Sequence, residues 1–143
     1  MHRRTFLTIV AISASSIGVV TLLIPGPFLE QVKAALPSET ANVMARTVGI
    51  LLLTIGVLNF MVRDHEDSPT LRAVFIANLF LQIGIIPIDP LAYFSGVYTT
   101  LGAFVPNTLL HLALAGGFAY YLTRMSRQRN SRHASTGRAT SPS

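Results

Sequence analysis

Seven polar or ionisable side chains interrupt the long apolar stretches of this chain, and they are the residues whose types could do chemistry. Side chains of this kind are costly to hold inside a membrane, so each is a candidate functional residue by default. Together they form a candidate intramembrane polar site of Arg46, Asn59, Asn78, Gln82, Asp89, Asn107 and His111.

Among these residues, His111 is the strongest single candidate for a chemical role. An imidazole has an ordinary pKa of about 6.5, so with Gln82 or Asp89 as a partner it could relay protons or bind a quinone oxygen. The simpler reading is a histidine that only hydrogen-bonds between helices. The residue type alone leaves both readings open.

The spacing of the polar residues predicts which of them meet. At 100° per residue, Asn78, Gln82 and Asp89 fall within one narrow arc of a helix, which predicts a polar stripe facing the interior. Asn107 and His111 lie one turn apart on another helix. We expect Arg46 to pair with Asp89, and Asn59 to hydrogen-bond with Asn78 across two helices. Such pairs can simply hold helices together.

Several chemistries have no support in the sequence. The absence of Cys excludes disulfides, thiolate catalysis and thiolate metal sites. No Ser-His-Asp spacing, phosphate-binding glycine loop or HExxH helix occurs. A metal site is not expected, because only Asp89 could join His111 as a ligand. We therefore expect no cofactor, no metal and no nucleic-acid partner.

Four apolar blocks supply the elements that would position these side chains. The chain has 143 residues, a mean hydropathy of +0.52 and only 12% charged residues, whereas soluble domains carry about 25%. A spanning helix needs about 20 mostly apolar residues. The sequence predicts an all-α, four-helix transmembrane domain over residues 1–123, with spans at about 6–24, 43–62, 71–88 and 107–123.

The basic residues predict the orientation of this bundle. Nine of the eleven Lys and Arg residues fall on one side of the four spans. The positive-inside rule then places both termini in the cytoplasm and the chain in the inner (plasma) membrane as a multi-pass protein. Between helices 3 and 4, residues 91–104 are rich in tyrosine and flanked by proline. This composition predicts an interfacial or re-entrant segment on the outer face.

The two ends of the chain lead to separate predictions. Arg3 and Arg4 precede x-Phe-Leu, as in a twin-arginine export signal, but the apolar run continues as a retained helix would. Both alternatives stay open. The tail, residues 124–143, is rich in Arg, Ser and Thr, which predicts a disordered basic cytoplasmic segment. Four of its arginines are expected to contact lipid headgroups, namely Arg124, Arg127, Arg129 and Arg132.

Small residues predict how the spans pack. The second span carries Gly49 and Gly56 seven residues apart near one face, and the first carries Ala14 and Gly18 one turn apart. Because apolar contact gains little between helices in lipid, close approach at small residues matters more. We therefore expect a compact bundle.

The layout also resembles a known group. Four short helices, with Arg46 in Ala45-Arg46-Thr47-Val48-Gly49 opening the second span and Arg63 closing it, resemble small DoxX-like bacterial membrane proteins over residues 41–122. The resemblance implies a four-helix membrane bundle, in some members associated with quinone or redox partners. It transfers no catalytic residue.

Three functions are compatible with these observations. The favoured one is a non-enzymatic membrane protein that binds a partner or a lipid-like ligand in its bundle. The second is a membrane subunit of a quinone-linked oxidoreductase, with His111 and Gln82 near the quinone. The third is a small transporter or proton pathway along the polar stripe. The expected partners are the bilayer, another membrane protein or a second copy of the chain, and an apolar small molecule such as a quinone.

Overall fold

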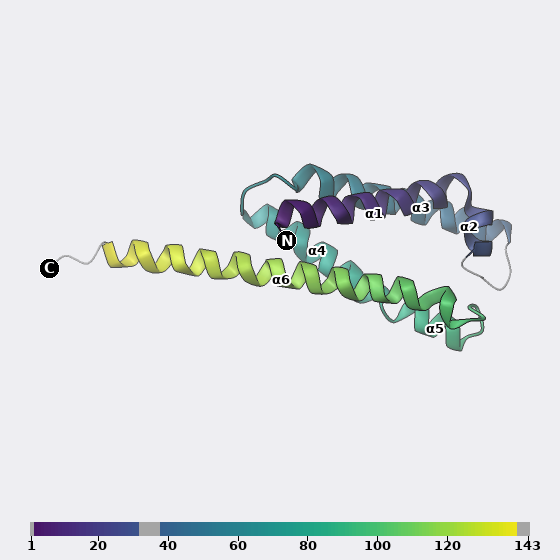
Figure 1. The fold of residues 1–143 in the computed structure, drawn as a ribbon. Helices are drawn as coiled ribbons and strands as arrows, with labels where there is room; N and C mark the ends of the chain where they lie inside the picture. The colour runs from purple at the N-terminus through teal and green to yellow at the C-terminus, as the bar shows by residue number, and fades with distance from the viewer. Residues whose placement is uncertain (1, 32–37, 140–143) are drawn as a thin grey trace.

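The described part of the chain is built from helices joined by short connections. The computed structural model describes residues 2–31 and 38–139, with side chains as far as Arg127. The helices are α1 (Arg3–Leu23), α2 (Pro25–Gln31), α3 (Glu39–Val62), α4 (Pro69–Ile85), α5 (Ile88–Phe94) and α6 (Leu101–Ala139) (Figure 1).

Four segments are long and apolar enough to cross a membrane, as predicted. They are Arg3–Leu23, Glu39–Val62, Pro69–Phe94 and Leu101–Arg127. Large apolar side chains on all of them are exposed, including Ile12, Met61, Phe80 and Leu109. Such surfaces suit lipid rather than water, so the fold is that of a multi-pass membrane protein.

Two serines fix where the second and third long helices begin. Ser38 accepts a hydrogen bond from the Ala41 backbone N–H, and Ser68 accepts one from the Leu71 N–H, both at 3.1 Å. Pro69 takes the first helical position after Ser68, where its missing N–H costs no helical bond.

The third and fourth helices differ from their predicted bounds. α4 ends at Ile85 and the chain re-enters helix at Ile88, because neither Pro87 nor Pro90 can continue the backbone ladder. α6 begins at Leu101, six residues before the predicted start, and carries Pro106 within it. Part of the segment predicted to be interfacial is therefore the first turns of α6.

The helix at the end of the chain is a second difference. Residues from Arg124 onward were expected to be disordered, but the α6 backbone is helical as far as Ala139. Arg, Met and Gln are good helix formers, and no proline interrupts the run. Composition alone missed this continuation from the preceding span.

Antiparallel helices α1 and α3 form the first of two helix pairs (Figure 1). Their backbones touch where Gly18 faces Gly49: a Cβ at Gly18 would lie 2.8 Å from the Gly49 carbonyl oxygen. Seven residues along each helix, Gly56 meets the Ala11 backbone and the Ser15 hydroxyl. The predicted small-residue face of α3 is confirmed, and it sets the distance between the two axes.

Helices α4 and α6 form the second pair, with matching seven-residue steps. Phe75 packs edge-on against Phe118, with ring centroids 5.4 Å apart. Gln82 lies seven residues after Phe75 in α4, and it contacts His111, which lies seven residues before Phe118 in α6. This repeat is the spacing at which two nearly antiparallel helices keep one seam in contact.

An aromatic core joins the two pairs at one end. Phe6 of α1 packs on Phe118 and Tyr121 of α6, with centroids 4.9 and 5.2 Å apart. Around these rings lie the other buried core residues, Leu7, Val10, Leu71, Phe75 and Met125.

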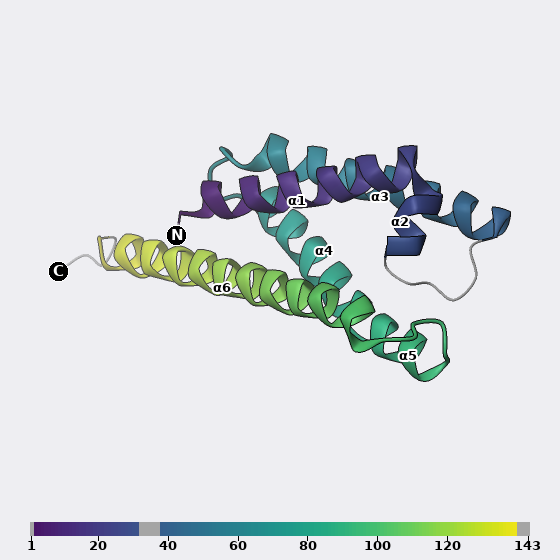
Figure 2. The ribbon, with the colours of Figure 1, turned by 45° about the vertical axis from the view of Figure 1, so that its right-hand side comes forward.

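Beyond the aromatic core the two pairs diverge toward α2 and α5 (Figure 2). One face of α1 records this change, because Val10, Ile17 and Val20 follow one another at steps of seven and three residues. Val10 is 2% exposed, Ile17 is half-buried and Val20 is 39% exposed. The two pairs therefore contact one another at one end only, which differs from the compact bundle that we expected.

Candidate polar site between the helices

The deepest polar contact is an amide pair between α3 and α4. The Asn59 Nδ2 donates to Asn78 Oδ1 at 3.0 Å, and both side chains are buried. Each amide also donates to a carbonyl four residues back in its own helix. The predicted Asn59–Asn78 bond is confirmed. Asn59 Oδ1 is buried without a partner among the described residues.

Gln82 and His111 form the next contact, between α4 and α6. The Gln82 Oε1 and His111 Nδ1 lie 2.5 Å apart, with Gln82 buried and His111 half-buried. Because an amide oxygen can only accept, Nδ1 carries the proton and Nε2 is left as the acceptor in the neutral ring. Of the two partners considered for His111, the structure selects Gln82.

Asp89 forms the third contact, from α5 to α6. Its Oδ2 accepts a hydrogen bond from Asn107 Nδ2 at 2.7 Å and a longer one from Thr108 Oγ1 at 3.4 Å. Asp89 is 5% exposed. Asn107 therefore reaches the site as expected, whereas Thr108 was missed, although it immediately follows Asn107 in the sequence.

The predicted ion pair between Arg46 and Asp89 is wrong. Arg46 is exposed on α3, and Asp89 has no cationic partner in residues 2–31 and 38–127. The pair was predicted because both residues lie at a similar depth in the membrane. A similar depth does not bring two residues into contact when their helices do not pack together. α3 packs on α1, whereas α5 packs on α6.

Three aromatic rings lie beside Asp89. Tyr93, one turn after Asp89 on α5, packs on Phe104 of α6 with centroids 5.1 Å apart. Tyr98, in the connection between these helices, stacks parallel to Phe104 at 6.4 Å. Burial raises the pKa of the Tyr98 phenol, and the charge of Asp89 raises it further, so this ring is neutral at any ordinary pH.

The arrangement of these polar side chains joins helices to one another. Polar side chains meet in three small groups, each joining two helices, and no group of three or more metal-ligating side chains occurs in the described residues. An interhelical hydrogen bond in lipid contributes about 0.6 kcal/mol on average. The contacts along α4 and α5 thus stabilise the second pair and link it to α3.

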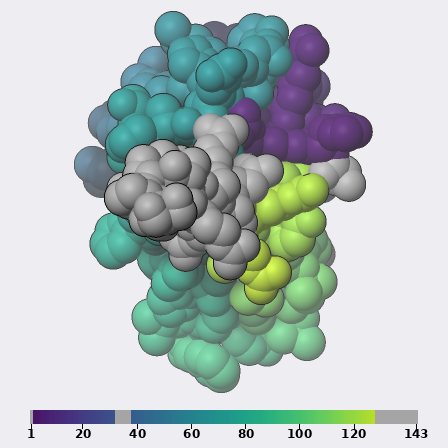
Figure 3. Space-filling view, turned by 90° about the vertical axis from the view of Figure 1, so that its left-hand side faces the viewer, coloured from purple at the N-terminus to yellow at the C-terminus, as the bar shows by residue number. Residues whose placement is uncertain are grey.

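Basic residues gather at the opposite end of the molecule. Arg3 pairs with Asp67 and donates to the His65 carbonyl, and Arg4 Nε lies 2.9 Å from Asp64. The start of α1 therefore lies beside the α3–α4 connection, as Figure 3 shows from that end. These pairs were not predicted, because Arg3 and Asp67 lie 64 residues apart in the sequence and are brought together only by the fold.

Two of the four arginines that were expected to contact lipid headgroups have described side chains. Arg124 is exposed and its Nη1 lies 3.5 Å from the Tyr120 hydroxyl, and Arg127 is also exposed. The side chains of Arg129 and Arg132 lie outside the described residues. Headgroup contact by all four stays a prediction.

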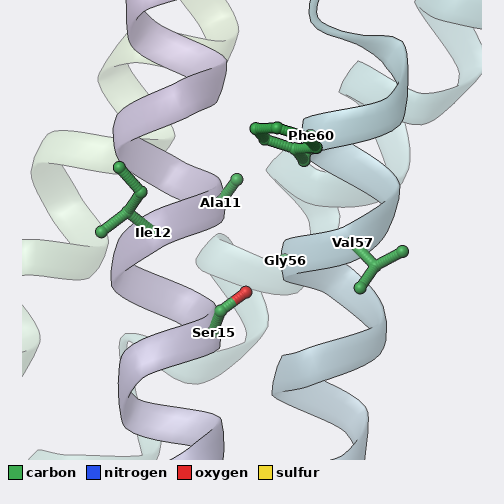
Figure 4. A pocket seen from close by; sticks show the side chains of 6 residues that line it. All are labelled: Ala11, Ile12, Ser15, Gly56, Val57 and Phe60. Atoms are coloured by element: carbon green, nitrogen blue, oxygen red, sulfur yellow. The ribbon is translucent and has the colours of Figure 1, made fainter.

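A hollow of about 270 Å³ lies between α1 and α3, on the surface of the first pair. It exists because Ala11, Ser15 and Gly56 are small, while larger side chains rise around them (Figure 4). Ser15 is the only polar side chain in its lining, which otherwise consists of Ala11, Ile12, Gly56, Val57 and Phe60. The hollow has the chemistry of an acyl-chain contact.

The fold and the polar contacts define a class of protein, a small all-helical membrane protein with four candidate spans. Comparisons with protein families, curated proteins and solved structures give no match. The resemblance to DoxX-like proteins stays a prediction.

Proposed function

We propose that this protein is a non-enzymatic protein of the inner membrane that binds a lipid-like molecule between its two helix pairs. The observation that carries this proposal is the divergence of the pairs beyond the aromatic core. On the α1 face that continues from Val10, which is 2% exposed, the exposed fraction rises to 39% at Val20. Apolar surface of this kind, open on the membrane side, fits an acyl or prenyl chain better than a polar substrate.

The proposal includes the orientation of the chain. Arg3, Arg4 and Arg63 lie around the α3–α4 connection, and the positive-inside rule puts that end in the cytoplasm. α5 and residues 95–100 then lie at the outer headgroup boundary. A retained α1 fits this arrangement, because Phe6, Leu7 and Val10 belong to the core that joins the pairs.

The test is to identify molecules that purify with the chain from native membranes by mass spectrometry. Ile17→Trp enlarges a side chain on the α1 face that looks into the diverging region, and it should reduce the amount of bound lipid-like molecule about tenfold. Ile76→Trp makes the same change on α4 at an exposed position and should leave that amount unchanged. Equal losses in both variants would contradict the proposal.

A quinone-linked role is a second candidate, favoured by one observation. His111 is half-buried, and its Nε2 is free to accept a hydrogen bond from a quinol hydroxyl, because Gln82 holds Nδ1. A quinone analogue should then raise the thermal midpoint of the purified protein, and His111→Ala should abolish the rise. A rise that survives His111→Ala would exclude this site.

A further inference from the structure

Asp89 is a buried carboxylate whose charge the described residues leave uncompensated. Both of its hydrogen-bond donors, the Asn107 amide and the Thr108 hydroxyl, are neutral and reach Oδ2. Oδ1 has no partner among the described residues. Oδ1 is not among the buried side-chain atoms without a partner, so it is reached from the surface of the molecule. A largely buried carboxylate is stabilised by a cation or by further donors, and a cation can approach this one at Oδ1.

The aromatic rings around Asp89 indicate which kind of cation fits. Asp89 and Tyr93 lie one turn apart on α5, and Phe104 and Thr108 lie one turn apart on α6. The helices pair these positions, Asp89 with Thr108 and Tyr93 with Phe104. Tyr98 adds a third ring against Phe104. Asp89 is therefore one helical turn from Tyr93, and its partner Thr108 is one turn from Phe104, next to a cluster of three half-buried rings. Aromatic rings attract cations to their faces through their quadrupoles.

An alkylammonium group suits this combination better than a metal ion. Metal ions such as Ca²⁺ need about six or more oxygen ligands, and the described residues offer no cluster of acidic side chains here. Alkylammonium groups need no such shell. They are recognised by aromatic faces together with a carboxylate, which supplies the charge.

We propose that Asp89, Tyr93, Tyr98 and Phe104 form a binding site for an alkylammonium group at the α5–α6 end of the molecule. The group can come from a soluble amine or from the choline or ethanolamine headgroup of a lipid. The site goes beyond the proposed function and does not depend on it, because it lies at the α5–α6 end of the second pair and needs no ligand between the pairs.

The test measures the thermal midpoint of the full chain in a non-ionic detergent during titration with choline chloride. Sodium chloride at equal concentration and 3,3-dimethylbutan-1-ol, the uncharged analogue of choline, are the comparisons. Choline should raise the midpoint in a saturable manner, and neither comparison should do so. An equal rise with sodium, or no rise with choline, would overturn the site.

Two variants tie the effect to these side chains. Asp89→Asn keeps the oxygen that accepts from Asn107 and Thr108 but removes the charge, and it should weaken choline binding at least about tenfold. Phe104→Leu should weaken binding about threefold to tenfold, whereas Phe80→Leu, at a position on α4 that is 80% exposed, should not. Unchanged binding in both Asp89→Asn and Phe104→Leu excludes the site.

Nanodiscs separate the two sources of the ligand. If a headgroup is the natural occupant, phosphatidylcholine in the disc should abolish the response to soluble choline, whereas a disc of phosphatidylglycerol alone should preserve it. A soluble amine as the occupant predicts the same response in both discs. Loss of bound lipid after Ile17→Trp with intact choline binding would leave this site standing and the proposed function supported separately.

Discussion

At the scale of single residues, the buried amide side chains make neutral hydrogen bonds between helices. Asn59 with Asn78 and Gln82 with His111 each join two helices through one bond. Arg46, the one arginine expected in this group, is exposed instead. Its long side chain can reach the interface from a helix end, which is how such residues avoid burial.

The position of Arg46 leads to the first prediction. Arg46→Glu should change the free energy of unfolding by less than about 0.5 kcal/mol, because the side chain is exposed and makes no ion pair with Asp89. Asp89→Arg should destabilise the protein, since it places a guanidinium against the Asn107 and Thr108 donors. Unfolding in detergent with added dodecyl sulfate measures both changes. A double variant that is more stable than Asp89→Arg alone would restore the rejected pair.

The amide pair leads to the second prediction. A double-mutant cycle with Asn59→Ala and Asn78→Ala should give a coupling energy of about 0.6 kcal/mol, and no more than about 1.7 kcal/mol, as found for interhelical bonds in lipid. The same detergent unfolding provides the four stabilities. Additive effects of the two changes would mean that the 3.0 Å contact contributes nothing.

At the scale of elements, the two pairs use different means of contact. α1 and α3 touch through glycine and alanine with almost no side chain between them. α4 and α6 keep larger side chains in their seam and meet through rings and hydrogen bonds. Close contact in the first pair therefore requires small residues between the helices, whereas contact in the second pair requires the larger side chains that lie between them.

The glycine contact leads to the third prediction. A Cβ at Gly49 would lie 2.8 Å from the Leu22 backbone nitrogen, so Gly49→Ala should destabilise the protein by about 1–3 kcal/mol. Gly84→Ala on α4 is the matched control, because nothing lies within 4 Å of its Cβ position. Without a clash, alanine at 84 should be neutral or stabilise the helix by up to about 1 kcal/mol. The opposite order of the two variants would refute the close crossing.

The sequence predicted what periodicity and local chemistry determine. The four spans, the buried arc of Asn78 and Gln82, and the Gly49–Gly56 face all follow from composition and spacing within one helix. The choice of neighbours depends on tertiary packing, which no single helix encodes. For this reason Arg46 was assigned the wrong partner, and the pairing of Arg3 with Asp67 was missed. Pro106 also misled the prediction, because α6 tolerates it near its start.

At the scale of the whole molecule, the start of α1, the α3–α4 connection and the far end of α6 lie toward one end, and α2 and α5 lie toward the other (Figure 1). Four spans produce this arrangement, because an even number of crossings returns the chain to its starting side. The aromatic core and the arginine pairs lie toward the first end. The second end is where the pairs separate, so it is the more adaptable part.

The arrangement leads to the fourth prediction, which the lack of native cysteine makes simple to test. Thr99→Cys, after α5, should react with a membrane-impermeant maleimide in intact cells. Glu66→Cys, between α3 and α4, should react only after the membrane is opened. Both positions are exposed. Reaction of both from the same side would rule out the four-span topology, and the reverse pattern would invert the orientation.

The ion pair between Arg3 and Asp67 has a consequence for how the protein is made. Asp67 is synthesised 64 residues after Arg3, which at about 5–20 residues per second corresponds to a delay of about 3–13 s. Within this interval α3 is made before Asp67, whereas α4 and α6 are made after it. The glycine contact between α1 and α3 can therefore form first, and the core residue Phe6 stays without Phe118 and Tyr121 until α6 has been made.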